Sequence, residues 1–79
     1  MIVWHVTTLK KYQKYRNEGF ILPPVRAWKD IISAGNFAIQ TGRKIILRLS
    51  FPDNAEQLEG HKGNAVVLNE RFQLPKDLK

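Results

Sequence analysis

The stretch Met1-Ile2-Val3-Trp4-His5-Val6-Thr7-Thr8 predicts the first strand of the fold and the start of its first helix. Side chains alternate along it, so that one face is apolar and the other carries His5 and Thr7. A period of two in apolar and β-branched residues is typical of a β-strand. Either Thr7 or Thr8 can cap the helix that follows, because a threonine hydroxyl accepts a hydrogen bond from a free N–H of the first turn.

The remaining periodicity predicts two helices and a small mixed or antiparallel sheet, which is the pattern of an α+β domain. The expected helices cover residues 8–18 and 28–40, and the expected strands cover residues 2–7, 20–22, 43–51 and 65–72. Residues 25–28 could extend the short strand 20–22 or begin the second helix. Gly19 and Gly42 stand where glycines commonly end helices. Gly35 leaves a break in the second helix as an alternative, since an internal glycine costs about 1 kcal/mol relative to alanine. Residues 53–64 predict the longest loop, and residues 76–78 predict a final turn.

Length and composition exclude several classes of protein. The 79 residues predict a single small domain, 1–79. The absence of cysteine excludes disulfides, thiolate metal ligands and cysteine nucleophiles. His5 and His61 are too few for a metal site, which needs three or four ligands. No apolar run approaches the roughly 18 residues that cross a bilayer, and no signal-peptide pattern is present, so we expect a cytoplasmic protein without a membrane partner.

The charge of the chain favours an anionic partner. Thirteen Lys and Arg against seven Asp and Glu give a net charge of +6. Nucleic acid, a nucleotide or an acidic protein would suit this charge, although it also suits plain solubility. On the first expected helix, four cations could grip a phosphate backbone while Tyr12 and Tyr15, which lie between them, stack on bases. The alternative is a solvated helix face whose tyrosines pack on the sheet. These candidate nucleic-acid contacts are Lys10, Lys11, Lys14 and Arg16.

His5 and Thr7 are the strongest candidates for a small-molecule site. Two apart in a strand, they lie on one face about 6–7 Å apart. Histidine can donate or accept a hydrogen bond near neutral pH, and the threonine could hold a ribose or phosphate oxygen. The alternative is that His5 bonds only to backbone and Thr7 only caps the helix. Arg26 and Trp28 could also line a cleft, although Trp28 could instead belong to the core.

Three of these segments together resemble a known fold. His5-Val6-Thr7-Thr8, Asn17-Glu18-Gly19-Phe20-Ile21 and the tryptophan of Arg26-Ala27-Trp28 look like the N-terminal half of the ADP-ribosyltransferase fold. The closest forms are the DNA-targeting ADP-ribosyltransferase toxins and the RNA 2′-phosphotransferases. In these families a strand ends in His-x-Thr, a helix follows, and a glycine precedes the next strand. Strand 43–51 and the ending 65–75 match the later order of elements.

The resemblance implies a half-barrel sheet that binds NAD. It implies that His5 binds the NAD ribose with support from Thr7. It also implies that an aromatic residue, for which Trp28 and Phe37 are the candidates, stacks on nicotinamide. The RNA 2′-phosphotransferases have several arginines around this site, and Arg26 and Arg43 are the arginines of this chain that could take such positions; Arg26 is the candidate for the cofactor site.

The resemblance also implies a catalytic glutamate at the start of the last strand, where it stabilises an oxocarbenium-like sugar. In this chain that place is Gly63-Asn64-Ala65, and the nearest carboxylates are Glu59 in the preceding loop and Glu70 further along. Glu70 is therefore the candidate catalytic partner of His5. Two possibilities follow: a transferase that uses Glu70, or a degenerate domain that binds NAD or a related nucleotide without transfer.

Two non-enzymatic functions remain open as alternatives to the ADP-ribosyltransferase-like domain. The first is a basic nucleic-acid-binding module that uses the first helix. The second is a protein-interaction module in which strand 43–51 or strand 65–72 forms an exposed sheet edge, for example in a homodimer.

Overall fold

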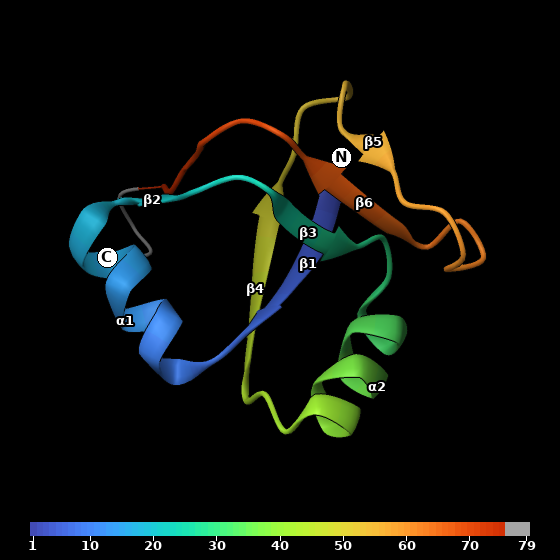
Figure 1. Cartoon of the computed structure of the whole chain (residues 1–79), viewed down its shortest axis with the longest axis horizontal. Coiled ribbons are helices and arrows are strands. Elements are labelled where there is room, and N and C mark those ends of the chain that lie inside the picture. Colours follow the sequence, from blue (N-terminus) through green and yellow to red (C-terminus); the bar gives the residue numbers. More distant parts are fainter. Residues whose placement is uncertain (76–79) are drawn as a thin grey trace.

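The computed structural model, which describes residues 1–75, is an α+β domain with two helices, a five-stranded antiparallel sheet and a separate two-stranded sheet (Figure 1). In chain order the elements are β1 (Ile2–Thr7), α1 (Leu9–Glu18), β2 (Phe20–Ile21), β3 (Val25–Trp28), α2 (Ile31–Thr41), β4 (Ile45–Ser50), β5 (Glu56–Gln57), β6 (Ala65–Leu68) and β7 (Phe72–Gln73). The large sheet has the order β4-β1-β3-β6-β5, and β2 pairs with β7. The expected α+β class is confirmed, and the strands of residues 1–75 close no barrel. The turn expected at residues 76–78 lies outside the described residues.

Both helices begin and end at residues whose local chemistry favours a cap. Thr8 caps α1, where its hydroxyl accepts a hydrogen bond from the Lys11 N–H at 3.2 Å. Gly19 ends α1 with a φ of 83°, a left-handed conformation that glycine adopts without strain. Asp30 caps α2, so this helix begins later than the expected residue 28, and it continues through Gly35 without a break.

The helices cover opposite faces of the sheet. Val6 and the half-buried Trp4 pack with Ala34 and Ala38 of α2. Val3, which points the other way in β1, belongs to the larger core that half-buried tyrosines of α1 and the β2–β7 pair complete. His5 shares the face of Val3, and therefore lies on the α1 side of the sheet.

The C-terminal part of the sheet differs from the expectation. The predicted strand 65–72 is two strands, because β6 ends at Leu68 and β7 leaves the large sheet to pair with β2. The predicted loop 53–64 contains β5, which pairs with the outer side of β6. As a result β6 is an interior strand and 65–72 is not an exposed edge, whereas β4 does lie at an edge. All four residues of β6 are buried, as suits a strand covered on both faces.

β1 and β3 pair only briefly. β1 pairs with β4 along its whole length, from Ile2 opposite Ser50 to Thr7 opposite Ile45. Its only register pair with β3 is Trp4 opposite Trp28. Beyond this pair the two central strands diverge, and this divergence positions the site described next.

No helix in the described part of the chain has the length and apolar character needed to span a membrane.

Candidate functional site

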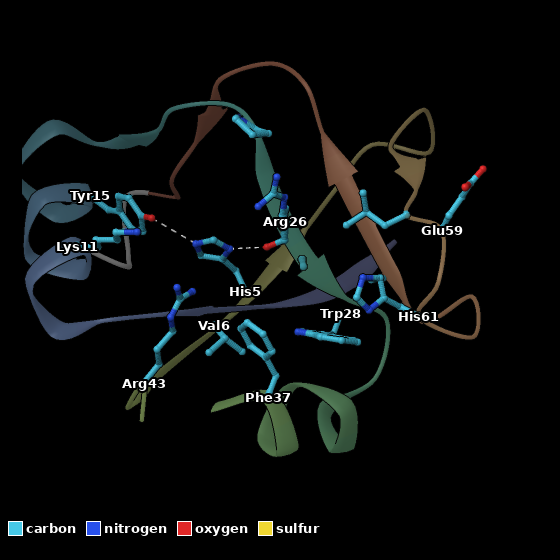
Figure 2. Close-up of a pocket in the computed structure, with 14 residues that line it drawn as sticks. His5, Val6, Lys11, Tyr15, Arg26, Trp28, Phe37, Arg43, Glu59 and His61 are labelled. Atoms are coloured by element: carbon cyan, nitrogen blue, oxygen red, sulfur yellow. Dashed lines mark hydrogen bonds between the residues drawn. The ribbon is translucent and has the colours of Figure 1, made fainter. Parts of the chain in front are cut away.

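A pocket with a volume of about 530 Å³ lies where β1 and β3 diverge (Figure 2). β1 contributes His5 and Val6 to its wall, and β3 contributes Arg26, Ala27 and Trp28. Helices and loops complete the wall from both sides of the sheet. The pocket is of the size that small-molecule sites usually have. It brings together three of the predicted cofactor residues: His5, Arg26 and Trp28.

His5 bridges the gap between the two strands. Its Nδ1 lies 2.6 Å from the Arg26 carbonyl oxygen, and its Nε2 lies 3.4 Å from the Tyr15 hydroxyl. Because a carbonyl oxygen can only accept, Nδ1 carries the proton and donates it. In the neutral ring, Nε2 is then an acceptor for the Tyr15 hydroxyl. The expected backbone bond of His5 is therefore present, and it leaves the second nitrogen with an accepting lone pair.

The surroundings of His5 keep its ring neutral. Its side chain is 8% exposed. Burial lowers the pKa of His5 below its ordinary value of 6.5, the hydrogen bond to Arg26 opposes this shift, and the charges of Arg43 and Lys11 add to it. Burial disfavours the charged form of histidine, and nearby cations disfavour it further. At neutral pH His5 therefore presents an acceptor rather than a positive charge.

One side of the pocket is an aromatic wall centred on Trp28. The Trp28 ring lies 5.6 Å from the Phe37 ring and 5.4 Å from the His61 ring, the latter in an edge-on arrangement at 87°. All three side chains line the pocket. Trp28 also packs with the core beneath α2, so both sequence-based interpretations of this residue hold. Such a wall can take a flat ring by stacking.

The other side of the pocket is cationic. Lys11, Arg26 and Arg43 line it, and the guanidinium of Arg43 sits 5.5 Å from the centre of the Phe37 ring. Within residues 1–75, none of these three cations forms an ion pair with a carboxylate. Glu59 is the one carboxylate of the described residues that lines the pocket, and Figure 2 shows it pointing outward, away from His5. The positive charge of this side therefore remains available to an anion.

The structure does not bring Thr7 or Glu70 into this pocket. Thr7 is 1% exposed and lies opposite Ile45 at the end of β1, where its hydroxyl has no hydrogen-bond partner. Glu70 is exposed, follows the end of β6, and lines a separate hollow with Glu56. The start of β6, not its end, reaches the pocket through Ala65.

The four predicted nucleic-acid contacts do not form one stripe. All are exposed on α1, which buries none of its residues. At about 100° per residue, Lys10, Lys11 and Lys14 share one side of the helix, whereas Arg16 points elsewhere, toward the Tyr12 ring at 5.7 Å. Lys14 pairs with Glu18 at 3.8 Å. Lys11 is the member of this group that lines the pocket.

The site also contains residues whose part in it the sequence did not reveal. Tyr15 was expected only to pack or to stack on bases, yet it contacts His5. His61 is exposed, yet its ring meets Trp28. The pairing of these residues depends on tertiary contacts between distant elements, which periodicity does not encode. No protein-family model, curated protein or solved structure matches the chain, so the chemistry of this pocket carries the functional argument.

Proposed function

We propose that the chain is a small ADP-ribosyltransferase-like domain that binds NAD or a related nucleotide in the pocket between β1 and β3. The observation that carries the proposal is the division of this pocket into an aromatic side and a cationic side. A nucleotide has the matching division, with a flat base at one end and phosphates at the other. Arginine is well suited to the phosphates because its guanidinium donates several hydrogen bonds in a fixed fork.

The proposal gives each side of the pocket a role. Trp28 and Phe37 stack on a base or on nicotinamide, and Arg26 and Arg43 neutralise the phosphates. His5 accepts a hydrogen bond from a ribose hydroxyl through Nε2, in place of the longer contact that Tyr15 makes at 3.4 Å. Burial favours the neutral ring that this role requires.

The relationship to the ADP-ribosyltransferase fold is part of the same proposal. Its support is the position of His5 in the first strand and the divergence of the two central strands beside it. The half-barrel of that fold is likewise an expectation that these two features favour. Since Glu59 points outward and Glu70 lies elsewhere, we assign binding and no catalytic step (Figure 2).

Calorimetric titration with NAD, ADP-ribose and AMP tests the proposal. The wild type should bind ADP-ribose, and Arg26→Ala should weaken the affinity about tenfold or more, a loss of about 1.4 kcal/mol. Arg48→Ala is the matched control, because Arg48 is an exposed arginine of β4 outside the pocket. Absence of binding by the wild type, or equal effects of the two substitutions, would contradict the proposal.

Binding of nucleic acid by α1 is the alternative function, favoured by the exposed cluster of Lys10, Lys11 and Lys14. A labelled single-stranded oligonucleotide should then bind with an affinity that falls steeply with salt. Loss of this binding in Lys10→Ala/Lys14→Ala, with unchanged binding in Arg26→Ala, would support α1 as the interface. The reverse pattern would place the nucleic acid in the pocket.

A further inference from the structure

α2 presents an apolar face to the outside of the molecule. Ile32 is 74% exposed and Ile39 is 82% exposed, although both are among the most apolar residues of the chain. The helix Ile31–Thr41 contains no charged residue, whereas the chain as a whole carries a net charge of +6. Its opposite side is in use, because Ala34 and Ala38 are buried against the sheet. Packing within one copy therefore does not explain why the outer face of α2 is apolar.

Gly35 is also unexplained by contacts within one copy. A Cβ atom placed on it would meet no atom within 4 Å, so the fold leaves room for a side chain there. Glycine is unfavourable inside a helix relative to alanine. A glycine on an open helix surface lets another backbone approach closely.

The arrangement of these residues is self-complementary. Ile32 and Ile39 lie seven residues apart, which is about two helical turns, and so they fall on one stripe. Gly35 and Asn36 lie midway between them. A two-fold axis through this midpoint would place Ile32 of one copy against Ile39 of the other, and Gly35 at the closest approach. Reciprocal contacts of this kind define the interface of a symmetric dimer.

Charge points to the same surface. Two copies that each carry a charge of +6 repel one another, and the repulsion is least where they meet through uncharged residues. Self-association through α1 would be less favourable, because the lysines of the two copies would then lie close together.

We propose that this α2 face, made of Ile32, Gly35, Asn36 and Ile39, binds the α2 face of a second copy in an antiparallel helix pair. An eleven-residue helix is about 16 Å long, so the interface is small and the dimer is weak. The inference is independent of the proposed function, because Phe37 and the pocket lie away from these positions on the helix.

Sedimentation over a wide range of protein concentration tests the inference. The average mass of the wild type should rise toward that of a dimer at high concentration. Ile32→Lys and Ile39→Glu should each raise the dissociation constant about tenfold or more. Leu9→Lys is the matched control, because it also replaces an exposed apolar residue by a cation, but on α1.

Two further variants test the symmetry directly. The double variant Ile32→Lys/Ile39→Glu should dimerise better than either single variant, since the introduced lysine of one copy would face the introduced glutamate of the other across the two-fold axis. Gly35→Ala should raise the thermal midpoint of the monomer and weaken the dimer. A wild type that stays monomeric throughout, a double variant that dimerises no better than the single variants, or an equal effect of Leu9→Lys would overturn the inference.

Discussion

The Nδ1 atom of His5 donates a hydrogen bond to the carbonyl oxygen of Arg26 at 2.6 Å, across the gap between β1 and β3. The two strands pair at Trp4 and Trp28 and then diverge. A side chain thus satisfies a strand carbonyl at the place where the backbone ladder is interrupted. The same bond fixes which nitrogen of His5 faces Tyr15, and so connects the stability of the sheet to the chemistry of the pocket.

Replacing His5 should destabilise the domain. His5→Ala removes a buried ring and its hydrogen bond, and we expect the free energy of unfolding to fall by about 1–3 kcal/mol. Urea denaturation measures this change. His61→Ala is the control, since His61 is exposed and should have much less effect. Equal unfolding midpoints for the two variants would show that the bond to Arg26 contributes nothing.

Stability should depend on pH through His5. Its pKa is lowered in the folded state, so between that pKa and 6.5 the unfolded chain binds more protons than the folded one. Stability then rises with pH in this range. The contribution is fully present above the unfolded pKa and is lost as the pH falls through the folded pKa.

Thermal unfolding midpoints from about pH 8 to about pH 5 measure this dependence. We expect the midpoint to fall on acidification, and we expect His5→Asn to show a smaller fall than the wild type. Parallel curves for the two proteins would assign the pH dependence to other groups.

Replacing Thr7 should stabilise the domain, whereas replacing His5 should destabilise it. Its hydroxyl is buried without a hydrogen-bond partner, whereas valine has nearly the same shape and favours strands equally well. Thr7→Val should therefore raise the free energy of unfolding by about 1 kcal/mol. Nucleotide affinity should not change, because Thr7 does not line the pocket. A lost affinity would restore the role that the His-x-Thr resemblance implies for this residue, and a lower stability would show that its hydroxyl has a hydrogen-bond partner in the folded protein.

Local chemistry explains why much of the fold could be predicted from the sequence. Thr8, Gly19 and Gly42 act within one helical turn of their own positions, and both helices end where these glycines predicted. Trp28 fitted the helical spacing but belongs to β3, because Asp30 provides a stronger cap two residues later. The chemistry around a helix end decided its boundary more reliably than the apolar period.

Pairing between distant strands explains what could not be predicted. The alternation of residues 65–72 carries no information on partners, so the change from β6 to the β2–β7 pair was missed. The same limit applies to the site. Period two placed His5 and Thr7 on one face correctly. It could not show that β1 diverges from β3 beside His5, or that Thr7 is buried.

The aromatic wall should contribute more to binding than its burial alone suggests. Trp28→Ala should weaken the affinity for ADP-ribose by about 1–3 kcal/mol, whereas Trp28→Phe should retain most of it, because a smaller ring still stacks. Calorimetry measures both changes, with circular dichroism to check folding. Similar losses for Ala and Phe would argue against stacking on this residue.

Nuclear magnetic resonance of the two indole N–H groups during a titration with ADP-ribose tests the central claim most directly. Trp28 lines the pocket and Trp4 does not, although the two are neighbours in the sheet. We expect a saturable shift that is clearly larger for Trp28 than for Trp4 and that disappears in Arg26→Ala. No shift at saturating ligand, or shifts of equal size for Trp4 and Trp28, would contradict a nucleotide site between β1 and β3.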